Sequence, residues 1–139
     1  MRTLNRTASE LLVREGIRGA TDITGFGLLG HAAAVARESR LTLELDAAAL
    51  PLLPGVLALA LRLQAGGLKA NRHVFEPEVE YVGTLDAALA AVLYDPQTSG
   101  GLFLLVPELE AAALVAELAG ARVVGHARPR GAKALVVRA

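Results

Sequence analysis

The sequence predicts one domain that contains both helices and strands, with the helices packed on a single β-sheet. Its 139 residues suit one domain around one core. Hydrophobic residues make up 53% of the chain and charged residues only 20%, so apolar burial can offset the loss of chain entropy on folding. Segments with helical spacing of apolar residues alternate with short segments typical of strands, which is the pattern of helices covering a sheet.

Three helices are expected in the first half of the chain. Apolar residues recur at helical spacing from Thr3 to Glu15, which predicts an amphipathic helix. A second helix, Gly25 to Arg40, is too apolar to face water on all sides and should be mostly buried. Pro54 before it and a glycine pair after it predict a third helix over Val56 to Gln64.

The second half predicts a loop followed by two helices. Ala65 to Pro77 has no clear period and is expected to be a long loop. Thr84 is suited to cap a helix over Leu85 to Leu93. Pro107 begins a helix with acidic residues in its first turn, which favours the helix dipole, and Gly120 follows its end.

Five segments are expected to be strands. Leu41 to Asp46 alternates apolar and polar side chains, which indicates a strand with one covered face. Leu102 to Val106 is a continuous apolar run, which suits a buried strand. Shorter strands are expected at Val79 to Val82, Arg122 to Ala127 and Ala134 to Val137. The pattern does not predict the order of the strands.

Composition and charge exclude several functional classes. Fourteen Lys and Arg residues balance fourteen Asp and Glu residues, so neither nucleic acid nor an acidic membrane is an expected partner. The chain has no cysteine, which excludes thiolate nucleophiles and zinc–thiolate sites. The longest apolar stretch, Ala47 to Leu61, is short and interrupted by prolines, so no membrane span is expected. Without an export signal, we expect a cytoplasmic protein.

A glycine pattern opens the second helix. Gly25 to Gly30 satisfies G-x-G-x-x-G, and Asp46 ends the next strand, as in a dinucleotide-binding fold. That fold requires an apolar strand running into the first glycine, whereas Gly19 to Thr24 is mostly polar. Asp22 would also place a negative charge beside an incoming pyrophosphate. A small dinucleotide-binding domain is therefore kept only as an alternative.

The same turn suits a phosphate bound together with Mg²⁺. Backbone N–H groups at a glycine-rich helix start favour an anion, and Asp22 just upstream can bridge through Mg²⁺ to phosphate oxygens. A purely structural alternative is that Asp22 or Thr24 caps the helix while the glycines permit close packing. His31, on the same helix, is expected to be a core residue with one hydrogen-bond partner.

A second candidate segment, Asp95 to Gly101, offers a carboxylate, an amide, two hydroxyls and two flexible glycines. Such a loop can shape an anion pocket, or it can be an Asp-Pro turn followed by a Gly-Gly bend. By itself this segment does not decide between the two interpretations.

Three segments together resemble selenophosphate synthetase (selenide, water dikinase). They are Ala20 to His31 (ATDITGFGLLGH), Leu50 to Gly55 (LPLLPG) and Asp95 to Leu102 (DPQTSGGL). Their order and spacing also agree, and the likeness runs from about Leu4 to the C-terminus. It matches only the C-terminal domain of that enzyme, which aminoimidazole ribonucleotide synthetase shares. The resemblance implies an α+β fold with a mixed β-sheet and packed helices, as one domain over residues 1–139.

The resemblance also implies a reaction, in which ATP, selenide and water give selenophosphate, AMP and phosphate, with Mg²⁺ holding the nucleotide. Asp22 is then expected to be a metal ligand, together with carboxylates of an N-terminal domain. Residues expected near the nucleotide and its phosphates are Thr21, Thr24, Gly25, Gly27, Gln97, Thr98, Ser99, Gly100 and Gly101.

The cysteine or selenocysteine of that family belongs to its N-terminal domain, so no catalytic residue is expected in this chain. Mg²⁺ and ATP are expected to bind only when an N-terminal domain of this type is present, in cis or in trans. The alternative function is a non-catalytic binding or assembly module that retains the fold. Such a module would expose an apolar patch and would be prone to self-association.

Overall fold

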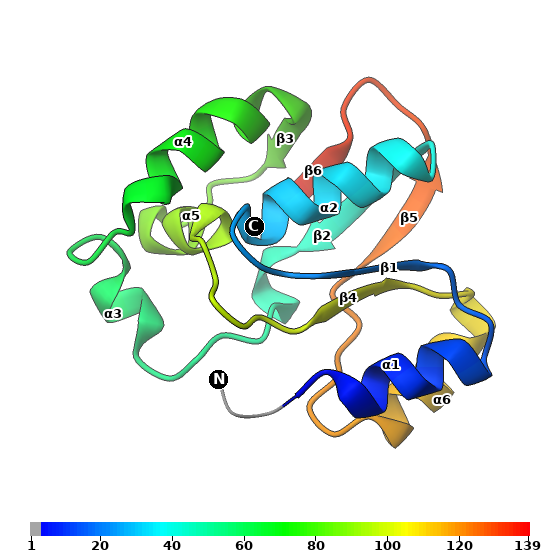
Figure 1. The fold of residues 1–139 in the computed structure, drawn as a ribbon. Coiled ribbons are helices and arrows are strands. Elements are labelled where there is room, and N and C mark those ends of the chain that lie inside the picture. The colour runs from blue at the N-terminus through cyan, green and yellow to red at the C-terminus, as the bar shows by residue number, and fades with distance from the viewer. Residues whose placement is uncertain (1–3) are drawn as a thin grey trace.

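Helices and strands alternate along residues 4–139, the part of the chain that the computed structural model describes (Figure 1). The expected α+β architecture is confirmed. Thr3, where the first helix was expected to begin, lies outside the described residues. In chain order the elements are α1 (Arg6–Arg14), β1 (Gly19–Asp22), α2 (Gly27–Glu38), β2 (Leu41–Asp46), a 3-10 turn (Ala47–Ala49), α3 (Val56–Ala60), α4 (Gly66–Phe75), a 3-10 turn (Glu76–Glu78), β3 (Val79–Val82), α5 (Ala87–Tyr94), β4 (Leu102–Leu105), α6 (Glu108–Glu117), β5 (Gly125–Pro129) and β6 (Leu135–Arg138).

The strands form two sheets, so the expectation of a single sheet is wrong. A mixed four-stranded sheet has the order β3-β6-β2-β5, in which β3, β6 and β2 are parallel and β5 is antiparallel to β2. The other sheet contains only β1 and β4, which are antiparallel. α2, α4 and α5 lie on one side of the larger sheet, whereas α1 and α6 lie together beside the smaller one (Figure 1).

β1 is the strand that the sequence pattern did not predict. It has only four residues, Gly-Ala-Thr-Asp, and none of the apolar alternation that marks longer strands. It forms because β4 supplies an apolar partner, with Asp22 opposite Leu102. β1 and β2 lie in different sheets, so β1, α2 and β2 do not make the parallel βαβ unit of a dinucleotide-binding fold. That geometry excludes the dinucleotide alternative.

β2 is covered on both faces, not on one. Leu43 and Leu45 face the helices and belong to the main core. On the other face, the Thr42 hydroxyl donates to the Lys133 carbonyl at 2.6 Å, and Glu44 is ion-paired to arginines of the neighbouring strands. The strand occupies a central position in the sheet, which explains why its polar side chains are buried as well.

Several helices differ from their expected limits. α4 occupies the segment that was expected to be a loop, because Leu68 and Phe75 pack into the core from one of its faces. α3 is a short helix of five residues. The carboxylate of Asp86, and not Thr84, caps α5 by accepting hydrogen bonds from the N–H groups of Ala88 and Leu89. Within residues 4–139, no helix is long and apolar enough to cross a membrane.

Two cores hold the domain together. The larger lies between α2, α4 and α5 and the four-stranded sheet. There Ala32, Ala33 and Ala36 are completely buried, and their short side chains let α2 lie close to the sheet. A smaller core joins α1 to α6 through Leu11, Leu114 and Leu118. The turn between β1 and α2 is therefore anchored on both sides by packed elements.

Candidate functional site

The turn that joins β1 to α2 leaves Asp22 in solvent. Asp22 is the last residue of β1 and is exposed. α2 begins at Gly27 after Phe26, and no side chain of the turn caps it. Neither Asp22 nor Thr24 therefore serves as a helix cap, so the capping alternative does not hold for these two residues. The start of α2 keeps its N–H groups free of a side-chain cap, as an anion site requires.

Two of the three motif segments are joined by backbone hydrogen bonds. The N–H of Ile23 donates to the carbonyl of Gly101 at 2.9 Å, and the N–H of Gly100 donates to the carbonyl of Ile23 at 3.1 Å. The N–H of Gln97 also donates to the carbonyl of Thr24, at 3.0 Å. The segments Asp22 to Gly27 and Asp95 to Gly101, far apart in sequence, thus form one unit, which we call the paired loops.

The glycines of the paired loops fall into two kinds. A Cβ on Gly27, where φ is +68°, would lie 2.7 Å from the carbonyl carbon of Tyr94, and a Cβ on Gly100 would lie 2.3 Å from the carbonyl oxygen of Ile23. These two glycines let the loops touch. A Cβ on Gly25 or Gly101 would meet nothing within 4 Å, so both backbones are open to a ligand.

His31 holds the tip of the first loop. Its Nε2 lies 3.1 Å from Thr24 Oγ1 and accepts a long contact, 3.4 Å, from the N–H of Phe26. His31 was expected in the core with one hydrogen-bond partner, but it is half-buried and has two partners. The ring of Phe26 is 58% exposed and rests against the rings of His31 and Phe75.

Asn71 is the site residue that the sequence analysis missed. It lies on α4 and is 7% exposed, and its Nδ2 donates to the carbonyls of Gly25 at 2.9 Å and Tyr94 at 3.0 Å. The signal was present, because Asn71 shares the spacing of Leu68 and Phe75 and is therefore a polar residue on an apolar helix face. The segment was treated as a loop, so that spacing was not used.

An open groove runs between α1 and the β1–β4 sheet and has Asp22 on its wall. Its volume is about 560 Å³. The residues that line it are Asn5, Arg6, Ser9, Leu12, Ala20, Thr21, Asp22 and Leu102. The Asn5 amide donates to the Gly100 carbonyl at 3.1 Å and so ties the start of α1 to the paired loops. Asp22 is thus accessible from a surface hollow.

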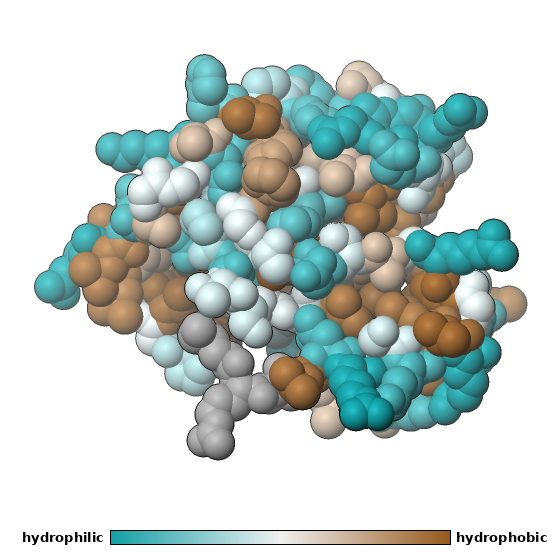
Figure 2. Space-filling model, viewed as in Figure 1, coloured by the Kyte–Doolittle hydropathy of each residue, from teal (hydrophilic) through white to brown (hydrophobic). Residues whose placement is uncertain are grey.

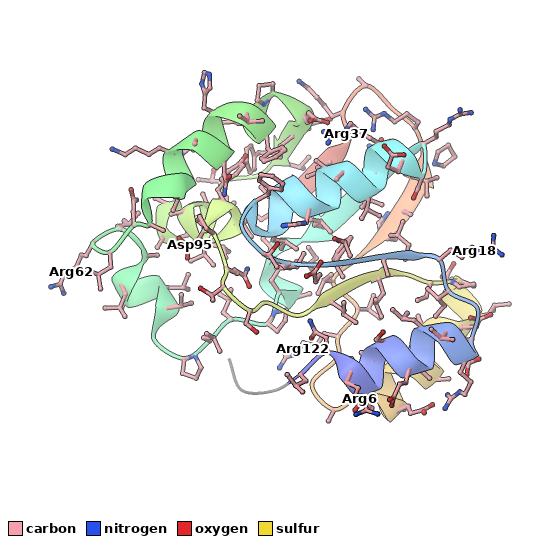
Figure 3. The ribbon with its side chains drawn as sticks, in the orientation of Figure 1. Arg6, Arg18, Arg37, Arg62, Asp95 and Arg122 are labelled. Carbon is pink, nitrogen blue, oxygen red and sulfur yellow. The ribbon has the colours of Figure 1, made fainter. Side chains whose placement is uncertain are left out.

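The remaining predicted residues lie at or near this unit. Thr98 and Ser99 are exposed, Gln97 is half-buried, and the Thr21 hydroxyl donates to the carbonyl of Asp22 at 3.1 Å. Asp95 is directed elsewhere: its carboxyl lies beside the backbone N–H of Ala65 and lines a small cavity of about 60 Å³ beside α3 and α5 (Figure 3). Burial raises the pKa of this carboxyl above its usual range.

The described residues do not contain a complete metal site. Within residues 4–139, no three His, Cys, Asp or Glu side chains gather closely enough to hold an ion. The oxygen donors around the first loop are of the type that Mg²⁺ accepts, with one carboxylate and several hydroxyls and carbonyls. Asp22 is the exposed carboxylate among them.

Known proteins match this chain along its length. Residues 1–138 match the family described as "AIR synthase related protein, C-terminal domain". The protein named "Selenide, water dikinase" of Clostridioides difficile (strain 630) is 35% identical over 140 residues, which cover 96% of this chain and 40% of that protein. The protein of the same name in Caldanaerobacter subterraneus subsp. tengcongensis is 37% identical over 144 residues, which cover 99% of this chain and 42% of that protein. The protein of the same name in Pseudomonas straminea is 46% identical over 100 residues, which cover 71% of this chain and 28% of that protein.

The chain spans about two fifths of the length of the first two of these relatives. The family that matches almost every residue is defined by a C-terminal domain, and the α+β fold agrees with that assignment. The chain therefore belongs to the family of AIR synthase related proteins, as a C-terminal domain of that family.

Proposed function

We propose that this domain supplies one half of a selenide, water dikinase active site, the half that holds the nucleotide phosphates and one ligand of their Mg²⁺. The reaction converts ATP, selenide and water to selenophosphate, AMP and phosphate. One observation carries the proposal: the paired loops form a single hydrogen-bonded unit that presents an exposed carboxylate, Asp22, beside an open groove. An isolated structural turn does not require an exposed carboxylate there.

The exposure of each residue in the paired loops indicates which role it would have. Asp22 would bind Mg²⁺, which neutralises phosphate charge when it is bound. Gly25 and Gly101 have open space above their backbones, which lets phosphate oxygens approach closely. The hydroxyls of Thr98 and Ser99 are exposed and can donate to the same oxygens. Gly27 and Gly100 serve mainly to keep the two loops in contact.

This chain would bind and orient the nucleotide, while an N-terminal domain would supply the selenium-handling residue and the other metal ligands. The absence of cysteine from the sequence agrees with that division, because a thiolate or selenolate must come from elsewhere. Such a shared site would lie in the cytoplasm, where ATP is available. Its partner would be a domain of the selenophosphate synthetase type, in cis or in trans.

Mixing the chain with a separately produced N-terminal half of a relative tests the proposal. We expect ATP- and selenide-dependent release of AMP from the mixture and none from either part alone. Replacing Asp22 with asparagine should lower that rate at least about tenfold, because a neutral amide is a much weaker Mg²⁺ ligand than a carboxylate. The melting temperature should not change, because Asp22 is exposed and caps nothing.

Glu80→Gln is the matched control, since it removes an exposed carboxylate on β3 and should leave the rate unaltered. A mixture that stays inactive at every ratio, or an Asp22→Asn variant as active as the wild type, would contradict the proposed function. An Asp22→Asn variant that unfolds would instead return this residue to a structural role.

A second candidate, an assembly module, is favoured by the apolar surface around α3. Five leucines of this region are 40–71% exposed: Leu53, Leu57, Leu59, Leu61 and Leu63. They account for apolar surface at the left of Figure 2, where Figure 1 has α3 and the turn after it. Exposed apolar area of this kind promotes association in water.

We therefore expect self-association that depends on protein concentration, measured by light scattering. The double variant Leu53→Glu and Leu61→Glu should remain monomeric, because it places two charges in the patch. Leu109→Glu is the control: Leu109 is 98% exposed but lies on α6, outside the patch. A wild-type chain that is monomeric at all concentrations would remove this candidate.

A further inference from the structure

Asn71 joins the first of the paired loops to the last residue of α5, directly before the second loop, through a single nitrogen atom. Its Nδ2 donates to the Gly25 carbonyl at 2.9 Å and to the Tyr94 carbonyl at 3.0 Å. Carbonyl oxygens only accept hydrogen bonds, so the nitrogen end of the amide must face them. Both amide hydrogens are used, one for each carbonyl. The side chain is 7% exposed, so water does not compete effectively for these bonds.

The bond to Tyr94 lies where the first loop packs against the end of α5. The Cβ position of Gly27 is 2.7 Å from the carbonyl carbon of Tyr94 and 2.9 Å from its oxygen. The carbonyl that Asn71 holds is therefore the one against which the glycine turn packs. Movement of the first loop away from the end of α5 would stretch one of the two Asn71 bonds, so Asn71 fixes the spacing between them.

The bond to Gly25 sets the direction of the next amide group. The Gly25–Phe26 peptide is trans, so the Gly25 carbonyl and the Phe26 N–H point to opposite sides of the chain. Asn71 holds the carbonyl toward the buried side, which turns the Phe26 N–H toward His31. That N–H reaches Nε2 of His31 only at 3.4 Å, which is long for a hydrogen bond. A charged phosphate oxygen is a stronger acceptor than this ring nitrogen and would displace it.

We propose that Asn71 is a positioning residue for a phosphate oxyanion at the glycine turn. It holds the Gly25 carbonyl inward and thereby orients the Phe26 N–H, which a phosphate oxygen would take over from His31. The identity of the anion rests on the proposed function, whereas the orientation of the amide does not. Asn71 itself touches no ligand in this arrangement and acts through Gly25.

Nuclear magnetic resonance of the isotope-labelled chain tests the orientation directly. In the wild type, we expect scalar couplings across both hydrogen bonds, from the Asn71 side-chain amide to the carbonyls of Gly25 and Tyr94. In Asn71→Ala, the Phe26 amide and the His31 ring resonances should shift. The Phe26 amide should also exchange with water at least about tenfold faster, since its orientation is no longer held.

Thr42→Val is the matched control, because Thr42 is also a buried polar residue that holds two backbone groups of a loop, at Gly131 and Lys133. It should lower the melting temperature and leave the Phe26 and His31 resonances in place. Unshifted resonances in a folded Asn71→Ala variant would overturn the proposal. So would a wild-type Asn71 amide that exchanges as fast as an exposed asparagine, a result that needs no variant to fold.

Two further measurements separate this proposal from the proposed function. If the wild-type chain is active with an N-terminal half, Asn71→Ala should raise the KM for ATP about tenfold, relative to Thr42→Val. An unchanged KM would overturn the positioning role.

If the wild-type mixture is inactive, the proposed function fails, and inorganic pyrophosphate is titrated against the chain alone. A shift of the Phe26 amide in the wild type but not in Asn71→Ala supports the proposal, and no shift in the wild type overturns it.

Discussion

Replacing Gly27 with alanine should remove a large part of the stability of the domain. At φ +68° an L-residue is strained, and the added Cβ would also lie 2.7 Å from the backbone of Tyr94, which cannot move aside as a flexible side chain could. The strain costs about 1–3 kcal/mol and the overlap a similar amount. Together they would lower the free energy of unfolding by about 2–6 kcal/mol, against a typical total of about 5–15 kcal/mol. Chemical denaturation followed by circular dichroism measures the loss.

Gly16 offers a matched control for the backbone strain. It has the same φ of +68°, but a Cβ there would meet nothing within 4 Å. Gly16→Ala should therefore cost only about 1 kcal/mol, the strain without the overlap. Gly25→Ala should cost less still, since Gly25 also has open space and no positive φ. If Gly27→Ala were no worse than Gly16→Ala, the loops would not be held in contact as described.

The periodic parts of this fold were predictable because their signals are local. α2 and β2 lie close to their expected ranges, since a long run of apolar residues at one period cannot be buried in another way. The motif segments were also recognisable, because their chemistry resides in residue type and spacing. The α+β class followed from these elements and from the resemblance.

The parts that were missed depend on contacts between distant segments. β1 has too few apolar residues to indicate a strand, and it exists through its pairing with β4, about eighty residues later. The division into two sheets follows from that pairing and has no local signal. α4 was missed because two glycines open it, although Leu68 and Phe75 show that tertiary packing overrides their low helix propensity.

In the candidate site, too, some features could be predicted from the sequence and others could not. Asp22 and the open glycines could be named from the motif, but the pairing of the two loops could not, since it depends on backbone hydrogen bonds between residues 23–24 and 97–101. Only the structure shows which glycines have open space beside them and which are in tight contact. Gly25 and Gly27 look alike in the sequence, yet one is open and the other is in tight contact.

Glu44 should make stability depend on pH in the acid range. Its carboxylate is buried on the outer face of β2, bonded to Arg138, and lies 3.2 Å from Nε of Arg128 and 3.5 Å from Nε2 of His126. The hydrogen bond from Arg138, more than the other charges, holds the pKa of Glu44 below its ordinary value of 4.5, although desolvation opposes this. Its stabilising contribution is therefore complete above pH 4.5 and is lost as the pH falls through the folded-state pKa.

Glu44→Gln should accordingly have a lower melting temperature than the wild type at pH 7. Below pH 4.5 the difference between the two melting temperatures should become smaller, because the wild-type Glu44 also loses its charge. Glu117→Gln is the comparison, because the pKa of Glu117 is also lowered, by Arg14, but both side chains of that pair are more than half exposed. Solvent screens such a pair, so its removal should change the melting temperature little at any pH. Equal effects of the two variants would mean that burial of Glu44 between β5 and β6 does not strengthen its ion pairs. A melting-temperature difference for Glu44→Gln that persists undiminished at pH 3 would show that the neutral contacts of this side chain, and not its charge, stabilise β2.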